Sequence, residues 1–173
     1  MKSNSFTISQ LQSKPVALKS GLPPILSKTT TTLILGSFPG EASLKAEQYY
    51  AHPRNYFWQL LSDVFNEPFS TLSYPNKILR LNQLDIGLWD AVDACVRIGS
   101  LDTAIKQAKI NNLDKLRHLA PELKRIFFNG KAAGKFASLI TEGKYKTIIL
   151  PSSSPANASL TYAEKLSAWR CLL

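Results

Sequence analysis

Two short segments of this chain carry the polar side chains whose types and spacing could do chemistry. The first is Leu33-Ile-Leu-Gly-Ser-Phe-Pro-Gly40, followed a few residues later by Ala51-His-Pro-Arg-Asn55. The second is Leu150-Pro-Ser-Ser-Ser-Pro-Ala-Asn157. Each is an apolar, β-prone run that stops at a turn rich in Gly, Pro and Ser. Ligands of open α/β sheets bind beyond the carboxyl ends of the strands, so the two turns predict one shared site.

The two turns offer amide, hydroxyl, aromatic and backbone groups. Nucleophile elbow, H-E-x-x-H and Walker motifs are absent from the sequence, and two histidines in the chain argue against a histidine-ligated metal. Neutral polar groups beside aromatic rings suit recognition of a flat heterocycle. We therefore expect a base-binding pocket that uses no metal and no cofactor. The side chains expected there are Ser37, Phe38, Tyr50, His52, Asn55, Asn129, Ser152, Ser153, Ser154 and Asn157.

The charge of the chain points to a polyanionic partner. Its 173 residues include 21 Lys or Arg against 12 Asp or Glu, a formal net charge of +9. The first 32 residues hold four lysines and no acid, and residues 106–146 hold ten basic residues against three acids. Clustered basic residues favour a nucleic acid partner over a uniformly charged surface.

The cysteines and the hydropathy bear on the cellular compartment. Cys95 and Cys171 are the only cysteines and have no paired spacing, which excludes a four-cysteine metal site and gives no support for a disulfide framework. No apolar run approaches the length of a membrane span. We expect a reduced, cytoplasmic protein that has no membrane partner and acts as a monomer.

Hydrophobic periodicity predicts alternating strands and helices. The predicted strands are 31–35, 86–89, 125–128 and 146–150. Helices are predicted from Tyr56 to Phe65, over 100–108, over 113–119, after Gly130 to about 140, and over 161–172, where Thr161 and Glu164 form a capping box. This alternation predicts a three-layer α/β/α fold around a central, mostly parallel four-stranded sheet. Residues 1–20 are predicted to be a flexible basic arm, and 21–173 a single domain.

Four motifs together resemble a known family. Gly36-Ser-Phe-Pro-Gly40, Ala51-His-Pro-Arg-Asn55 with Phe57-Trp58, and Phe128-Asn-Gly-Lys131 resemble the uracil-DNA glycosylase superfamily, with spacing most similar to its mismatch-specific G:U/T branch. The loop Leu150–Asn157, with Leu88-Trp-Asp90 and Gly99-Ser-Leu-Asp102, resembles the hypoxanthine-DNA (deoxyinosine) glycosylase group of that superfamily. The likeness spans the chain from about Gly21 onward.

The resemblance implies a monofunctional DNA glycosylase of base excision repair. Such an enzyme flips a deaminated base, hypoxanthine in preference, out of DNA and hydrolyses its N-glycosidic bond without a cofactor. Uracil mispaired with guanine is the alternative substrate, and xanthine a third. A non-catalytic DNA-binding module of the same fold is the alternative of another class, and a hydrolase of free nucleosides is a further one.

The resemblance also assigns roles to single residues. Phe38 stands where the superfamily usually has the Asp or Asn that positions water, and the hypoxanthine group implies that Asn55 takes this role. Asn55 would equally suit the N-cap of the following helix. Tyr50 stands where the mismatch-specific branch stacks an aromatic ring on the flipped base, with packing beside Tyr49 as the alternative. Phe38 suits either the core or the pocket wall.

The remaining roles concern the base edge and the DNA backbone. Asn129 either hydrogen-bonds the base edge or forms an Asn-Gly turn, and His52 either binds substrate or shapes its turn. The backbone N–H groups of Gly36, Ser37 and Phe38 are candidates to meet the leaving base. The DNA-binding residues implied are Lys131 and the loop Ser152, Ser153, Ser154, Pro155, Ala156 and Asn157, with one of the last three as the wedge.

Overall fold

Four parallel strands form the centre of the protein. The structure is a computed structural model that describes residues 17–140 and 145–173. Strands β2 (Thr32–Gly36), β3 (Ile86–Asp90), β6 (Arg125–Asn129) and β7 (Lys146–Leu150) pair in the order β3-β2-β6-β7, every pair parallel. Each predicted strand is present within one residue of its expected bounds, so the prediction of the central sheet is confirmed.

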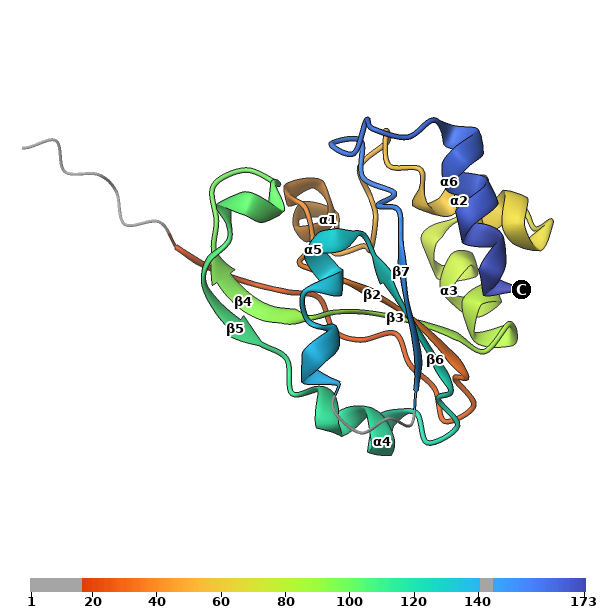
Figure 1. The fold of residues 1–173 in the computed structure, drawn as a ribbon, viewed down its shortest axis with the longest axis horizontal. Coiled ribbons are helices and arrows are strands. Elements are labelled where there is room, and N and C mark those ends of the chain that lie inside the picture. Colours follow the sequence, from red (N-terminus) through yellow and green to blue (C-terminus); the bar gives the residue numbers. More distant parts are fainter. Residues whose placement is uncertain (1–16, 141–144) are drawn as a thin grey trace, which may run out of the picture.

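Helices cover both faces of this sheet. Alternate side chains of a strand point to opposite faces, so Ile34 packs in one apolar cluster and Leu33 and Leu35 pack in the other. The first cluster lies under α2 (Phe57–Phe65), α3 (Tyr74–Gln83) and α6 (Tyr162–Trp169), on the right of Figure 1. The second lies under α4 (Leu116–Leu119) and α5 (Lys131–Gly134), on the left. The predicted three-layer α/β/α fold is therefore confirmed.

The predicted helices are confirmed in part. At α6 the Thr161 hydroxyl accepts from the Glu164 N–H and the Glu164 carboxylate accepts from the Thr161 N–H, which is the expected capping box. A 3-10 turn, Arg170–Leu172, follows α6, another precedes α4 at Leu113–Lys115, and a third follows α5 at Ala137–Leu139. The helices α1 (Glu41–Ala46) and α3 were not predicted. No helix in the described part of the chain is long and apolar enough to span a membrane.

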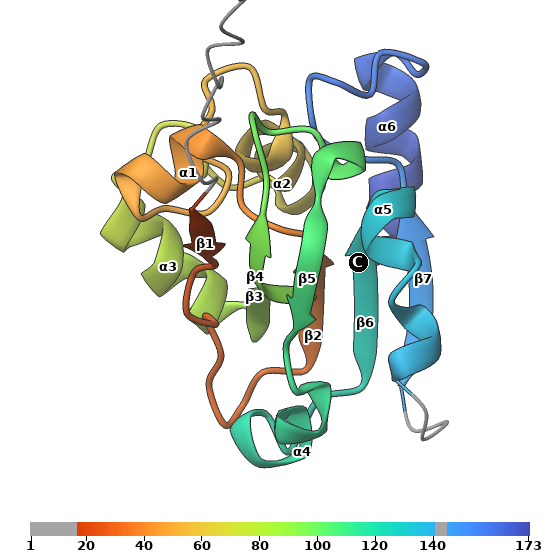
Figure 2. The same ribbon diagram turned by 90° about the vertical axis from the view of Figure 1, so that its left-hand side faces the viewer.

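The helix predicted over 100–108 is wrong. The segment instead forms a 3-10 turn, Asp102–Ala104, and then strand β5 (Lys106–Ile110), which pairs antiparallel with β4 (Val92–Val96) (Figure 2). Strand propensity depends on cross-strand partners more than on local sequence, and the partner strand β4 had not been recognised.

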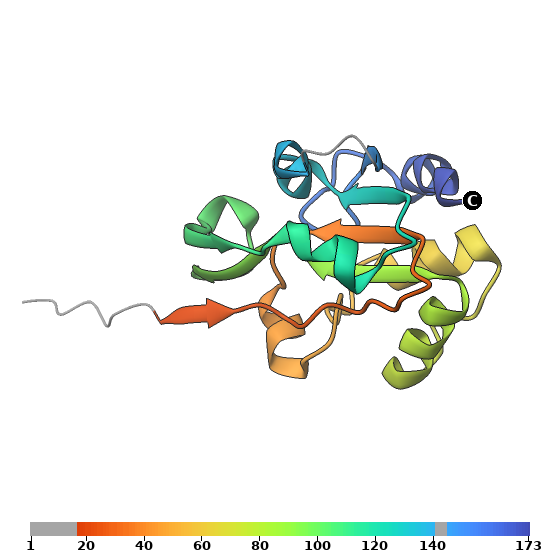
Figure 3. The ribbon, with the colours of Figure 1, turned by 90° about the horizontal axis from the view of Figure 1, so that it is seen from below.

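A third strand joins β4 from the opposite side. Strand β1 (Leu18–Ser20) pairs antiparallel with β4 and completes a three-stranded sheet in the order β1-β4-β5. In Figure 3 this red strand and the green strands β4 and β5 lie to the left of the parallel sheet. Residues 18–20, which the sequence analysis placed in the basic arm, thus pair with β4, and the division into an arm and a single domain stays a prediction. Residues 1–16 of the predicted arm lie outside the described residues.

Candidate active site

A cavity of about 250 Å³ opens at the carboxyl ends of the parallel strands. Strands β2, β3 and β6 contribute their last residues, Gly36, Asp90 and Asn129. The two turns singled out from the sequence both border this cavity, and we call residues 36–40 the first loop and residues 151–157 the second loop. Of the predicted site residues, Lys131 and Asn157 do not line the cavity. Those that do are Gly36, Ser37, Phe38, Tyr50, His52, Asn55, Asn129, Ser152, Ser153, Ser154, Pro155 and Ala156.

Ser153 ties the second loop to two other segments. It has no exposed surface. Its backbone N–H donates to Asn129 Oδ1 at 2.9 Å, and Asn129 Nδ2 donates to its Oγ at 2.8 Å. Its carbonyl oxygen accepts from the Tyr56 N–H at 3.1 Å, next to the start of α2. Ser153 therefore holds its neighbours in place. The side-chain amide of Asn129 makes its two hydrogen bonds to this residue of the second loop.

Gly130 allows the second loop to approach β6 closely. Its φ of +98° lies in a region that side chains rarely adopt. A Cβ atom at this position would stand 2.7 Å from the Cβ of Ser152. The Asn129-Gly130 turn is thus required by the fold, and the same turn places Asn129 at the cavity.

Asn55 has the geometry of a helix cap and also lines the cavity. Its Oδ1 accepts from the Phe57 N–H at 3.0 Å, one residue into α2. The backbone N–H of Asn55 donates to the His52 carbonyl at 2.8 Å, and His52 Nδ1 accepts from the Arg54 N–H at 3.1 Å. Asn55 thus forms a turn that leads into α2, one residue before Tyr56, which is the N-cap of that helix, and His52 forms the preceding turn. A carbonyl oxygen has a second lone pair, and Asn55 Nδ2 donates to no described residue, so the amide keeps capacity for water.

The ring of Tyr50 is fixed by packing against the core. It stacks on Phe57 with ring centroids 3.6 Å apart and an angle of 14° between the planes. Its backbone has a φ of +54°, an uncommon conformation for a residue with a side chain. One segment therefore presents both a stacked aromatic ring and Asn55 to the cavity.

Phe38 is a core residue that borders the cavity. It is 6% exposed and packs with Val92 and Cys95. The guanidinium of Arg97 lies 4.8 Å from the centre of its ring, a cation–π contact. The position that usually carries a water-positioning Asp or Asn thus holds an apolar ring against the three-stranded sheet.

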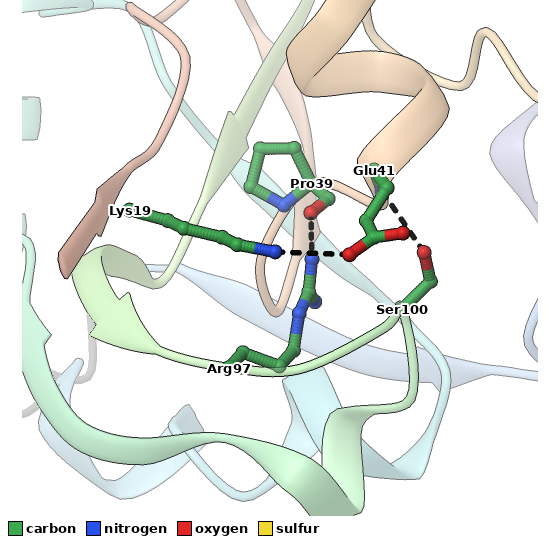
Figure 4. A network of polar contacts seen from close by, with 5 residues as sticks. All are labelled: Lys19, Pro39, Glu41, Arg97 and Ser100. Atoms are coloured by element: carbon green, nitrogen blue, oxygen red, sulfur yellow. Dashed lines mark hydrogen bonds and ion pairs between the residues drawn. The ribbon is translucent and has the colours of Figure 1, made fainter. Parts of the chain in front are cut away.

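The three-stranded sheet holds the first loop by charged groups (Figure 4). Arg97, which is 1% exposed, donates through Nη2 to the Pro39 carbonyl. Lys19 Nζ lies 3.0 Å from Glu41 Oε1, and Ser100 Oγ accepts from the Glu41 N–H at 2.9 Å. Nothing in the first loop's own sequence predicts these contacts, because β1 and the segment that follows β4 supply them.

Two carboxylates at the cavity were not among the predicted site residues. Asp90, at the end of β3, is 4% exposed, and burial together with the nearby charge of Asp102 raises its pKa to about 7, against the opposing effect of Arg97. Asp102 accepts from the Ser37 hydroxyl at the cavity wall. Asp90 directly follows a predicted strand, as Asn129 does, so the position at a strand end also points to Asp90.

The arrangement can bind a flat polar ring and hold a water molecule. Its neutral amides and hydroxyls are able to hydrogen-bond a heterocycle, and the stacked Tyr50 gives an aromatic wall. Within residues 17–140 and 145–173, no three His, Cys, Asp or Glu side chains are grouped as metal ligands.

Comparisons with known proteins agree with this geometry. The family model of the uracil DNA glycosylase superfamily matches residues 23–172. A protein named hypoxanthine DNA glycosylase from Methanosarcina barkeri is 42% identical over 151 residues, covering 87% of this chain and 95% of its own length. A relative of the same name from Methanosarcina acetivorans is 40% identical over 140 residues. This match covers 81% of this chain and 89% of the relative's own length.

A solved structure has the same fold. The solution NMR structure of a candidate uracil DNA glycosylase from Methanosarcina acetivorans superposes with a TM-score of 0.79 at 37% identity. The match covers 90% of this chain and 99% of that one.

Proposed function

The chain belongs to the uracil DNA glycosylase superfamily, and we propose that it is a monofunctional DNA glycosylase that excises deaminated bases, hypoxanthine in preference. The observation that carries the proposal is the cavity at the strand ends, where Asn55 and Tyr50 meet neutral groups suited to a base. The names of the two similar Methanosarcina proteins support hypoxanthine as the preferred base.

In this proposal the cavity receives a base that has left the duplex. Extruding a nucleotide costs a few kcal/mol and costs least for a mispaired base, which favours deaminated bases. Asn55 holds a water molecule over the sugar carbon, and the bond from that carbon to the base breaks. The backbone N–H groups of Gly36, Ser37 and Phe38 and the ring of Tyr50 fix the base in position.

The second loop is the proposed grip on the DNA backbone. Pro155 and Ala156 are exposed and line the cavity, so they are the residues proposed to enter the vacated stack. Ser152, Ser154 and Asn157 are half-buried beside them, and Lys131 is exposed at the start of α5. Ser153 is buried and its backbone N–H and Oγ are both hydrogen-bonded to Asn129, so its part in DNA binding is to hold the loop.

The proposal includes a monomeric, cytoplasmic protein with chromosomal DNA as its partner. Cys95 and Cys171 are free cysteines, which supports a reducing compartment. Light scattering of the free protein and of its DNA complex tests the stoichiometry.

The deciding experiment measures base excision on duplexes that carry one inosine, uracil or xanthine. Strand breaks at inosine that appear only after alkali are expected, because a monofunctional glycosylase leaves an intact abasic strand. Asn55→Ala should lower the single-turnover rate by about 100-fold or more, since it removes the group that positions water. Asn76→Ala, at an exposed position of α3, is the matched control and should leave the rate unchanged.

Three other outcomes would redirect the proposal. Cleavage mainly at uracil would keep the reaction and change the substrate. Binding that weakens steeply with salt, without excision of any of the three bases, would favour a DNA-binding module, for which the apolar Phe38 is the supporting feature. Activity on free inosine alone would indicate a nucleoside hydrolase.

A further inference from the structure

The carboxyl group of Asp90 lies at the inner end of the cavity, where β3 ends beside Gly36. Its Oδ1 fills the space over Gly36, because a Cβ atom added to Gly36 would stand 2.1 Å from that oxygen. Its Oδ2 is buried and has no hydrogen-bond partner among the described residues. A buried polar atom without a partner costs free energy, so its persistence at a cavity points to a partner that arrives with the substrate.

The Tyr50 hydroxyl is a second unpaired group at the same place. It is buried and likewise has no hydrogen-bond partner in the described part of the chain. It lies 3.3 Å from the Cβ position of Gly36, and Asp90 Oδ1 lies 2.1 Å from the same position, so the Tyr50 hydroxyl and the Asp90 carboxyl group come together at one place in the cavity. Burial raises the pKa of Tyr50, so its hydroxyl keeps its proton at neutral pH and can only donate or accept as a neutral group.

Asp90 is surrounded by groups that favour its neutral form. Burial and the negative charge of Asp102 both raise its pKa, which reaches about 7, while Arg97 opposes them. Tyr49 and Tyr50, the other titratable groups that face it, are both protonated at neutral pH, because burial raises the pKa of each. The cavity thus offers a carboxylic acid with a transferable proton, and no lysine or arginine is among the described lining residues.

A departing purine carries developing negative charge, which the site stabilises by hydrogen-bond donors or by a proton. Breaking the N-glycosidic bond leaves the bonding electron pair on the base, and donors in a water-poor site stabilise that charge most when they can transfer a proton. We propose that Asp90 is a further catalytic residue of this site and, as a neutral carboxylic acid, donates a proton to the leaving base. The inference rests on the glycosylase activity proposed above.

The proposed step balances as a hydrolysis. The bond between the sugar carbon and the base nitrogen breaks, and its electron pair goes to the base. The Asp90 proton moves to an acceptor on the base, which leaves a carboxylate. The water held by Asn55 forms the new carbon–oxygen bond and releases one proton to solvent. After the free base leaves, Asp90 takes a proton from solvent, so the net reaction consumes one water.

The opposite role for Asp90 would give the opposite pH dependence. An ionised Asp90 acting as a base on water would make excision faster as pH rises through about 7. A proton donor makes it slower over the same range. Asp90 is 4% exposed and Asn55 is half-buried, so in this proposal the deeper Asp90 meets the inserted base and Asn55 faces the sugar.

The test is single-turnover excision of hypoxanthine between about pH 5.5 and about pH 8.5. The wild-type rate should fall as pH rises through about 7. Asp90→Asn keeps the size and a hydrogen-bond donor but has no proton to transfer. It should lower the rate at about pH 6 by about 30-fold or more and remove the pH dependence, while DNA affinity changes by less than about threefold. Asp93→Asn is the matched control, because Asp93 pairs with Lys109 away from the cavity lining.

The outcomes separate this inference from the proposed function. Unchanged rate and pH profile in Asp90→Asn, with wild-type excision intact, would overturn the inference alone. A wild-type rate that rises with pH and is lost in the variant would make Asp90 a base and also overturn it. No excision by the wild type of any of the three bases would overturn both proposals.

A second measurement on the wild-type protein keeps the inference testable if the variant does not fold. The side-chain carboxyl carbon of Asp90 is followed by ¹³C NMR during a pH titration of the free protein. A midpoint near 7 is expected, and a midpoint near that of an exposed aspartate, about 4, would overturn the inference.

Discussion

The two sides of the cavity are built from different chemistry. On the side of the first loop, the buried groups are ionisable: Asp90 and Arg97 lie within the fold, and two nitrogens of Arg97, Nε and Nη1, have no partner among the described residues. On the side of the second loop, the buried groups are a neutral amide and a serine, Asn129 and Ser153, which satisfy each other with two hydrogen bonds.

The first-loop side of the cavity should therefore respond to pH, whereas the second-loop side should have the same structure and stability across the pH range. Charged groups in a buried site change protonation or lose stability when the solution changes, whereas paired neutral groups do not titrate. The proposed proton donor lies on the first side, and the loop proposed to grip DNA lies on the second. The four predictions below test this contrast, starting with the largest effect.

The pH dependence of stability should come from the first side. The Asp90 pKa is about 7 in the folded protein and near 3.8 in the unfolded chain, so the folded state holds the proton more tightly. Stability from this group is complete below about pH 4 and is lost as pH rises through about 7. Asp90→Asn should therefore gain about 2–3 kcal/mol relative to wild type between about pH 5 and about pH 8, measured by urea unfolding. A constant difference between the two proteins would contradict this.

Removing the hydrogen-bonded pair of Asn129 and Ser153 should destabilise the second-loop side of the cavity at every pH. Asn129→Ala leaves the N–H and hydroxyl of buried Ser153 without partners, which should cost about 2 kcal/mol. Excision should fall with it, because the same loop positions Tyr56 next to Asn55. Urea unfolding at two pH values measures both size and pH dependence. A loss of stability in Asn129→Ala that grows with pH would contradict the difference between the two sides of the cavity.

Removing the charge of Arg97, which holds the first loop, should disturb that loop more than it changes the free energy of unfolding. Arg97→Met replaces a buried cation, two of whose nitrogens have no partner among the described residues, with an apolar side chain of similar length. Relief of the cost of burying that charge should offset the contacts that are lost. The free energy of unfolding should change by less than about 1 kcal/mol. The hydrogen bond to the Pro39 carbonyl is lost, so excision should fall by about threefold to tenfold. A large loss of stability with full activity would reverse the interpretation of Arg97.

The exposed ion pair between Lys19 and Glu41 should contribute least to stability and to the excision rate. Glu41→Gln removes the ion pair with Lys19, whose two side chains are 55% and 28% exposed. Solvent-exposed pairs add little because water and salt screen them. The unfolding midpoint and the excision rate should both match wild type within experimental error. A clear effect on excision would show that the ion pair positions the first loop.

Much of this protein follows from local sequence. Buried parallel strands are continuous apolar runs, so Leu33 to Leu35 and Ile126 to Phe128 identified the central sheet without knowledge of their partners. Turns rich in Gly, Pro and Ser then marked where those strands end, and the carboxyl ends of parallel strands meet at one edge. The cavity was therefore located from the sequence, and the four motifs indicated the family.

Tertiary structure alone decided which groups at that site are buried and paired. β1 and β4 pair between residues 18 and 96, a separation that no local periodicity encodes, and this sheet turned a predicted helix into β5. The burial that raises the Asp90 pKa and the two hydrogen bonds that occupy Asn129 arise from segments far apart in the chain. Sequence determined where the strands end and which side chains stand there, because those features are local. The fold decided what each side chain can do, because protonation and hydrogen bonding depend on neighbours brought together only by folding.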